Sequence, residues 1–226
     1  MDVVLLDASP SSVEQLEYFE AILEHLGVRI YRISRMSADE LAKGRVLMIA
    51  GKRFEKYTVE EREIIIKHTQ AGHRLIVMLD GDSVPFFDSM QDILGVAGIY
   101  IKSTKVLDGA SLEFSTRNIN RSHAITMGVD ELYFRNAVCF LLAQKRTTPI
   151  EILIRSEKNH SPPEAILACM ARLGNGRILA VSTWEILKED MIRKGSNALF
   201  VVSAIFWLLD KKPPMDLIQR LRVLLR

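Results

Sequence analysis

The sequence predicts an α/β protein built on a doubly wound, mostly parallel sheet of the flavodoxin-like kind, with an antiparallel C-terminal extension. Three observations predict it. In the first half, short apolar runs alternate with segments whose apolar residues recur at helical spacing. The central runs are apolar without interruption, as expected of strands that helices cover on both faces. In the second half, strand-like runs follow one another, which favours antiparallel pairing.

The first half contains four predicted strands, at residues 3–6, 28–33, 46–50 and 75–79. A predicted helix follows each strand. Capping boxes, in which Ser or Thr precedes Glu by three residues, mark the first three starts at Ser11, Ser37 and Thr58. Ser83 and Pro85 are suited to start the fourth. The helices are expected to end near four glycines, Gly27, Gly44, Gly72 and Gly95.

The second half contains six predicted strands, at residues 98–101, 111–114, 138–143, 150–154, 165–172 and 177–181. The last two flank Gly174-Asn175-Gly176, a strong hairpin signal. Asn197 is suited to cap a buried helix over 198–209, after which Pro213-Pro214 interrupts the chain. An amphipathic helix forms the tail. We expect one domain over 1–210, followed by a basic amphipathic helix over 211–226.

Composition excludes several classes of protein. Of the 226 residues 48% are apolar and the net charge is +2, unlike a disordered chain, and a nucleic-acid partner is therefore unlikely on charge alone. Two cysteines make neither a disulfide framework nor a zinc site, which favours a cytoplasmic location. The longest apolar run covers 12 positions, whereas a membrane-spanning helix needs about 20. No signal peptide is visible.

Charge is unevenly distributed along the chain. Residues 1–108 hold 13 Lys and Arg against 17 Asp and Glu, a net of −4. Residues 109–226 hold 17 against 11, a net of +6. A solvated basic tail and a basic binding face are both compatible with this pattern.

Ligands of doubly wound sheets bind at the carboxyl ends of the strands, which selects residues 7–12, 51–57, 80–83 and 182–183. Carboxylates there are able to hold Mg²⁺, although the simpler interpretation is that Asp82 or Ser83 caps the next helix. The candidate ligand-binding residues at these ends are Asp7, Ser11, Asp80, Asp82 and Ser83.

His123 is a further candidate because it lies in a predicted loop, with a local turn role as the alternative. Glycine-rich phosphate loops are absent from the sequence, and no histidine pair has the spacing of zinc ligands. We therefore predict no catalytic residue, no metal ligand and no cofactor.

Several segments resemble the class I glutamine amidotransferase-like superfamily in its non-catalytic branch, which includes the GIFT domains of intraflagellar-transport and gliding-motility proteins. The match covers about residues 2–210, and the order of the motifs makes it specific. It rests on a strand, a gap and an aromatic-Thr-x-x-Glu helix start, a Gly-containing strand, a His-x-Ile-Thr-x-Gly element and the last predicted strand. These are residues 47–51 with 57–61, 70–78, 123–128 and 176–181.

The resemblance implies an amidotransferase-like fold and a protein that scaffolds a complex. Active amidotransferases carry a Gly-x-Cys-x-Gly elbow after the fourth strand, where this chain has Asp80, and their His-x-Glu pair is not evident. Other protein subunits are the implied partners. The predicted contact residues of the tail are Leu217, Ile218, Arg220, Leu221, Leu224 and Leu225. The alternative is a Mg²⁺-dependent hydrolase, or a domain that binds a sugar or phosphate ligand through its strand-end carboxylates.

Overall fold

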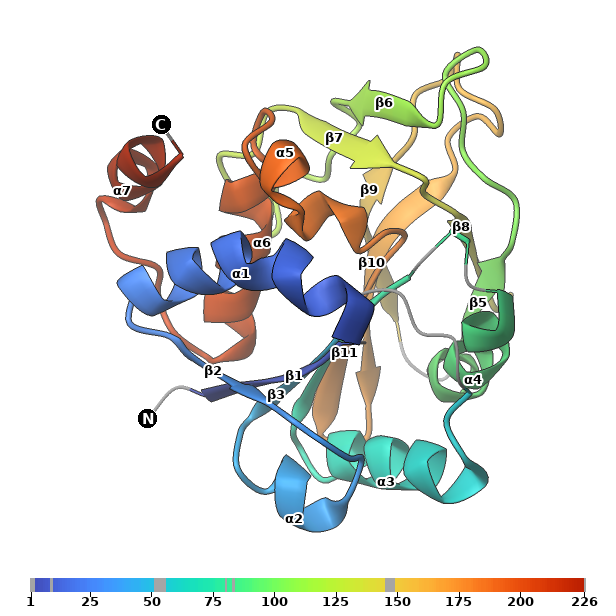
Figure 1. The fold of residues 1–226 in the computed structure, drawn as a ribbon. Helices are drawn as coiled ribbons and strands as arrows, with labels where there is room; N and C mark the ends of the chain where they lie inside the picture. Colours follow the sequence, from blue (N-terminus) through green and yellow to red (C-terminus); the bar gives the residue numbers. More distant parts are fainter. Residues whose placement is uncertain are drawn as a thin grey trace.

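The computed structural model describes residues 3–8, 10–50, 56–79, 81–82, 84–144 and 149–225, apart from the side chains of residues 10, 11, 13, 84 and 85. Helices lie on both faces of a central sheet, as Figure 1 shows. The helices are α1 (Pro10–His25), α2 (Ala38–Leu41), α3 (Val59–Gln70), α4 (Val84–Gly95), the 3₁₀ helix η1 (Glu185–Leu187), α5 (Glu189–Ile192), α6 (Asn197–Leu208) and α7 (Leu217–Leu224).

The described residues form a nine-stranded sheet of order β2-β1-β3-β4-β11-β10-β8-β5, with β9 paired to β10. The first five strands of that order run parallel to one another, and the others pair antiparallel. The strands are β1 (Val3–Asp7), β2 (Arg29–Arg32), β3 (Val46–Ile49), β4 (Arg74–Met78), β5 (Ile99–Lys102), β8 (Cys139–Leu142), β9 (Ile150–Arg155), β10 (Ile166–Leu173) and β11 (Gly176–Val181). This confirms the predicted doubly wound sheet with an antiparallel extension.

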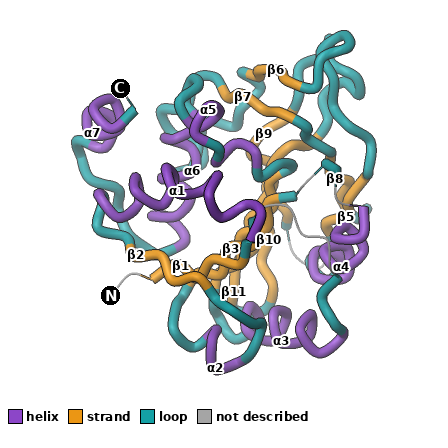
Figure 2. The backbone as a smooth tube through the Cα atoms, viewed as in Figure 1, coloured by secondary structure: helices purple, strands orange, loops and turns teal. Residues whose placement is uncertain are grey.

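Four short elements of the second half differ from the prediction. The strand expected at 111–114 is β6 (Glu113–Thr116), which pairs with β7 (Leu132–Arg135) in a separate two-stranded sheet. The short helices η1 and α5 were not predicted either. The two helices have three and four residues, about one turn, so neither shows a repeat of apolar residues at helical spacing. The two strands have four residues each, too few for a distinct run of alternating apolar residues. Figure 2 shows the long loops that join β6 and β7 to the main sheet.

Two of the predicted capping boxes can be compared with the structure. The Thr58 hydroxyl accepts a hydrogen bond from the Glu61 backbone N–H, and the Glu61 carboxylate accepts one from the Thr58 N–H. Ser37 makes only the first of these two bonds, to Glu40. The side chain of Ser11 lies outside the described part of the chain.

Asn197 is not the cap of α6 that the sequence predicts. It is the first helical residue, is fully buried, and bonds through its side-chain amide to other segments. Its Oδ1 accepts from the Tyr133 N–H at 2.9 Å, and its Nδ2 donates to the carbonyls of Tyr133 and Met191 at 2.9 and 2.8 Å. The amide thus acts as a backbone substitute that joins α6 to β7 and α5.

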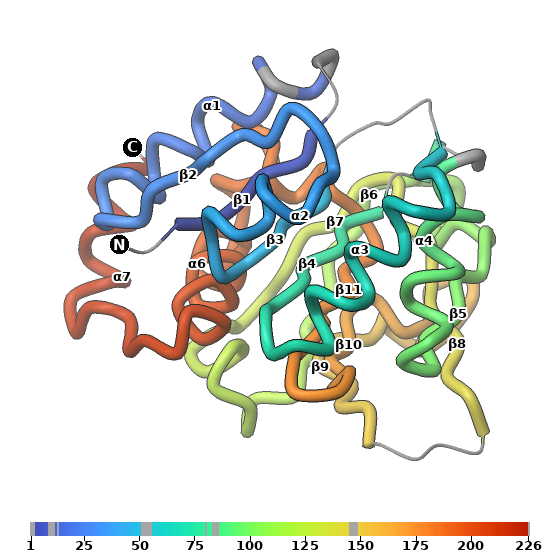
Figure 3. The backbone as a smooth tube through the Cα atoms, turned by 90° about the horizontal axis from the view of Figure 1, so that it is seen from below, coloured from blue at the N-terminus to red at the C-terminus, as the bar shows by residue number. Residues whose placement is uncertain are grey.

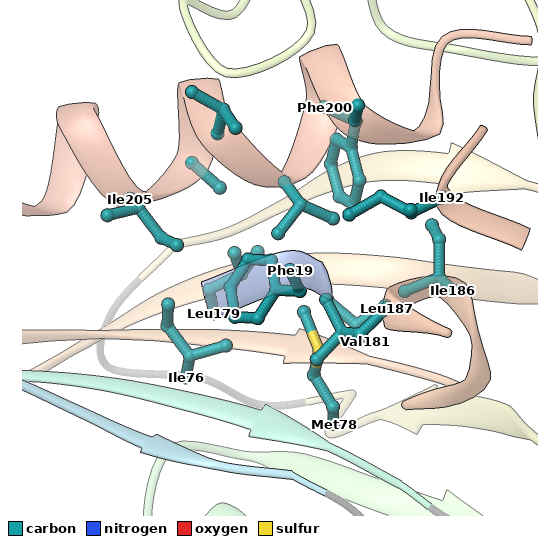
Figure 4. Close-up of a cluster of buried hydrophobic side chains, with 14 of the residues drawn as sticks. Phe19, Ile76, Met78, Leu179, Val181, Ile186, Leu187, Ile192, Phe200 and Ile205 are labelled. Atoms are coloured by element: carbon teal, nitrogen blue, oxygen red, sulfur yellow. The ribbon is translucent and has the colours of Figure 1, made fainter. Parts of the chain in front are cut away.

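Each face of the sheet carries its own apolar core. One core lies under α1, α6 and α7, and the other lies under α3 and α4. Figure 3 shows these two groups of helices on opposite sides of the sheet. Figure 4 shows Phe19 of α1 and Phe200 of α6 in one cluster of buried side chains with residues of β4 and β11. Both cysteines, Cys139 and Cys169, are buried and free. Among the described residues, no helix has the length and apolarity needed to cross a bilayer.

The β10–β11 hairpin is fitted closely against the end of α3. The Asn175 N–H donates to the Gln70 carbonyl at 3.0 Å. A Cβ atom on Gly176 would overlap the backbone carbonyl oxygens of Thr69 and His73. Glycine is required at this position because two backbones approach each other there.

We expect Gly176→Ala to lower the free energy of unfolding by about 2–3 kcal/mol, because backbone cannot move aside as a flexible side chain would. Urea denaturation measures the effect. Gly95→Ala is the control, since its nearest atoms lie 3.5 Å away and its backbone is helical. Equal stability of the two variants would contradict the close fit.

Two histidine rings stack at the same place, His68 and His73, with 3.8 Å between their centroids. Burial, and then the charge of His73, lowers the pKa of His68 to about 4. In the unfolded chain the pKa of a histidine is about 6.5. Between the folded and the unfolded pKa values, the unfolded chain therefore binds more protons than the folded one.

We therefore expect stability to fall by about 1–3 kcal/mol as the pH drops from 6.5 to 4, after allowance for partial exposure of the ring. Thermal denaturation at several pH values in this range measures the effect. The melting temperature should depend less on pH in His68→Gln, and should keep its pH dependence in His25→Gln, in which an exposed histidine is replaced. A slope that survives in His68→Gln would assign the pH dependence to other groups.

Candidate functional site

The carboxyl ends of β1, β3, β4 and β11 meet at one edge of the sheet, where the sequence places its ligand-binding candidates. The backbone ties these ends together: the Ala50 N–H donates to the Asp7 carbonyl at 3.0 Å, and the Trp184 N–H donates to the Leu79 carbonyl at 2.7 Å. Two of the five predicted strand-end residues, Asp7 and Asp82, have described side chains. Asp80 and Ser83 lie outside the described residues, as does the side chain of Ser11.

Asp7, the last residue of β1, is buried, with 7% of its surface exposed. The hydroxyl of Tyr57 donates to its Oδ2 atom. Tyr57 is itself 2% exposed, and its backbone N–H donates to the Ser89 hydroxyl at 3.0 Å. The start of α3 and the middle of α4 therefore fix the tyrosine that holds the Asp7 carboxylate.

Asp82 is held from two sides. Lys105 Nζ lies 2.6 Å from its Oδ1 atom, and Asn136 Nδ2 donates to its Oδ2 atom at 2.8 Å. Asn136 has a φ of 53°, and a Cβ atom on Gly81 would overlap its carbonyl oxygen. Glycine at position 81 is thus needed for this close approach.

The described strand-end carboxylates do not gather into a metal centre. Across the described ranges, no group of three or more His, Cys, Asp or Glu side chains is placed to hold a metal ion. Asp7 and Asp82 instead each bond to side chains of this chain. Structural bonds of this kind compete with a ligand for the same oxygens.

Three buried polar atoms near these strand ends have no hydrogen-bond partner among the described residues, namely Asn136 Oδ1, Ser182 Oγ and Trp184 Nε1. The sequence selects residues 182–183 only through the general rule for strand ends. Thr183, by contrast, is satisfied: its hydroxyl donates to the Arg135 carbonyl at 2.8 Å and accepts from the Glu185 N–H at 3.1 Å. The edge therefore keeps unused hydrogen-bonding capacity beside Asp82.

His123 lies away from these residues, near the amino end of β11. Its Nδ1 atom accepts from the Ile125 N–H at 3.1 Å, and its ring meets the edge of Trp207 with 5.1 Å between centroids. Burial lowers the pKa of His123, the charge of Glu151 raises it, and that of Arg177 lowers it further. The ring thus shapes its loop and also lines a groove beside α6.

The tail helix α7 has one face packed on its own domain. Leu217 and Leu221 are each 4% exposed, and Leu224 and Leu225 pack partly against the same core. The Tyr18 hydroxyl donates to the Leu224 carbonyl, and Arg193 Nη1 donates to the Leu225 carbonyl, both at 2.5 Å.

The other face of α7 meets solvent. Ile218 is 48% exposed and Val223 is 70% exposed, while Arg220 pairs with Asp216 at 2.9 Å. Of the six predicted contact residues, only Ile218 and Arg220 are well placed to meet a partner. The other four hold the helix in place.

No protein-family model matches the chain, and no curated protein does. Solved structures do share its fold. The mmIFT52 N-terminal domain aligns with a TM-score of 0.78 at 14% identity, covering 92% of this chain and 97% of that one. A protein from Bacteroides uniformis described as ThuA-like aligns at 0.63 and 12% identity, over 92% and 91% of the two chains.

A cytoplasmic protein from Salmonella typhimurium aligns with a TM-score of 0.67 at 10% identity, over 94% of this chain and all (100%) of that one. A β-galactosidase from Bacillus circulans contains a similar unit, with a TM-score of 0.56 at 12% identity, over 94% of this chain and 31% of that one. At these low identities the likenesses show a shared fold, a mostly parallel central sheet with helices on both faces.

The Tyr57–Asp7 bond leads to a stability prediction. Tyr57→Phe removes one donor from a buried carboxylate, and we expect it to lower the free energy of unfolding by about 1–3 kcal/mol. Tyr100→Phe is the control because Tyr100 is 43% exposed and should change stability little. Chemical denaturation compares the two, and similar values would show that the bond contributes nothing.

Proposed function

We propose that this chain is an interaction module of the non-catalytic, GIFT-like branch of the amidotransferase-like proteins, and that it scaffolds a protein complex. The observation that carries the proposal is the orientation of α7, which is anchored through one face and leaves a second face, with apolar and basic side chains, open to solvent. The alignment with the mmIFT52 N-terminal domain over nearly the whole of both chains supports the branch.

Anchoring makes the exposed face of α7 a prearranged surface. Four leucines and two hydrogen bonds to its last carbonyls fix the helix, so little ordering entropy is lost when a partner binds. Exposed apolar residues follow one another along the tail: Met215 is 107% exposed, with Ile218 and Val223 further along. Such residues on a fixed helix are typical of a docking surface.

A groove of about 220 Å³ runs beside this face, between α7 and the segments that precede α6 and β7. Ile218 and Arg222 line it from α7, and Gly128, Asp130 and Ser196 line it opposite. Lys211 and Lys212 add positive charge at the base of the tail. We infer a protein partner with an apolar anchor residue and an acidic rim.

The strand ends support a binding role over hydrolysis. The position of the amidotransferase nucleophile corresponds to Asp80, both cysteines are buried elsewhere, and the Asp7 and Asp82 carboxylates bond within the chain. A hydrolase or a sugar-binding or phosphate-binding domain that used these carboxylates would have to break those bonds first. The cytoplasmic location stays a prediction, and two free thiols are compatible with it.

The test replaces exposed residues of α7. We expect Ile218→Glu combined with Val223→Glu to reduce partner recovery at least about tenfold, because a charge replaces an apolar anchor, while leaving the melting temperature within about 2 °C. Affinity purification of the tagged full chain from its native cells, with quantitative mass spectrometry, measures recovery.

Leu221→Ala is the matched control, since it empties a buried position and should lower the melting temperature by weakening the attachment of α7. Lys56→Glu, on an exposed side chain of another surface, controls for added negative charge. Unchanged recovery of every partner by the double variant would overturn the proposal.

A further inference from the structure

A second groove, of about 740 Å³, opens at the amino end of β11, away from the strand ends that the sequence selects. It lies between the end of α6, the loop that carries His123, and the exposed surface of β9 and β10. Neither α7 nor the strand-end carboxylates take part in it. The side chains that matter are His123, Glu151, Met170, Arg172, Arg177 and Trp207.

Two arginines stand directly opposite each other in this groove. Arg172 of β10 and Arg177 of β11 are register partners in the antiparallel hairpin, so their side chains emerge on the same face of the sheet. Like charges in this arrangement repel each other and destabilise the pair. Arg172 is exposed and forms no ion pair with any described residue, so nothing in this part of the chain balances its charge.

Arg177 is only partly neutralised. It pairs with Asp210 at 3.2 Å, but Arg45 and Arg74 pair with the same carboxylate at 3.2 and 3.1 Å. Arg45 precedes β3, Arg74 is the first residue of β4, and Arg177 is the second residue of β11. The parallel strands therefore bring three guanidiniums to one point. One carboxylate thus serves three cations.

Glu151 is the other carboxylate of the groove. It accepts a hydrogen bond from Asn120 Nδ2 at 3.3 Å, and its second oxygen lies 3.9 Å from His123 Nε2. It is therefore oriented toward the loop wall. Among the described residues at this end of the sheet, the four arginines carry two more charges than Asp210 and Glu151 together. Arg172 and Arg177 line the groove itself, whereas Arg45 and Arg74 lie outside its lining.

A flat apolar wall stands beside these charges. Trp207 of α6 is half-buried, with the Arg177 guanidinium 4.4 Å from the ring centroid and His123 against its edge. These contacts fix the indole in place. Met170, also half-buried, lies next to it in the groove lining.

We propose that this groove binds a phosphate monoester carried on a flat or apolar group. A dianion balances the two excess charges, and guanidiniums bind phosphate oxygens through paired hydrogen bonds. Arg172 and Arg177 clamp the phosphate from two strands, and the attached group packs on Trp207 and Met170. The site adds a ligand to the scaffold function and is independent of α7.

Phenyl phosphate is the probe, because it combines both parts of the ligand in the smallest molecule. Isothermal titration calorimetry of the full chain at low salt should show saturable binding, weaker binding of inorganic phosphate, and an affinity that falls as salt rises. Arg172→Gln should lower the affinity for phenyl phosphate by about tenfold or more. Its fold should be intact, because Arg172 is exposed and forms no ion pair with any described residue.

Arg35→Gln removes the same charge from an exposed position beyond β2, at the opposite edge of the sheet, and should change affinity less than about twofold. A nucleoside monophosphate and a phosphotyrosine peptide then compete with the probe. Stronger competition by the nucleoside monophosphate supports the proposal with a free metabolite as the ligand. Stronger competition by the phosphotyrosine peptide supports it with a phosphorylated protein as the ligand. Absence of binding by the unmodified chain, or equal affinities of the two variants, overturns it.

Discussion

The parallel pairing of β4 with β11 is the interaction on which the rest of the structure depends. These strands are about a hundred residues apart in the sequence, from Arg74 opposite Arg177 to Met78 opposite Val181. The pair joins the parallel half of the sheet to the antiparallel half, and both apolar cores contain side chains from it. Without it, the hairpin of β10 and β11 would have no edge to continue.

The same pairing determines the chemistry at both ends of the sheet. At the carboxyl end it brings Ser182 and Trp184 beside the segment that follows β4, where Asp82 is held by Lys105. At the amino end it places guanidiniums side by side around Asp210. At one end the described carboxylates are held by internal hydrogen bonds, and the other end has an excess of positive charge beside an open groove.

The tail shows how one short helix can serve stability and exposure together. Its leucines complete the core under α1 and α6, so α7 belongs to the same apolar cluster as the rest of the domain. Only one face of α7 packs on the domain, so Ile218 and Val223 on its other side are exposed to solvent. An amphipathic pattern alone does not reveal which partner the apolar side has, since a core and a second protein bury it equally well.

Features that depend on neighbours along the chain could be predicted from the residues alone. These are the four strand–helix units, the Thr58–Glu61 capping box, the hairpin around Asn175 and the buried helix after position 197. Contacts between distant segments became visible only in the folded chain: Asn197 bonds to β7, Tyr57 holds Asp7, and Arg172 and Arg177 share a groove with Trp207. The physical reason is that strand order and register, set by packing of the whole sheet, bring these distant side chains together.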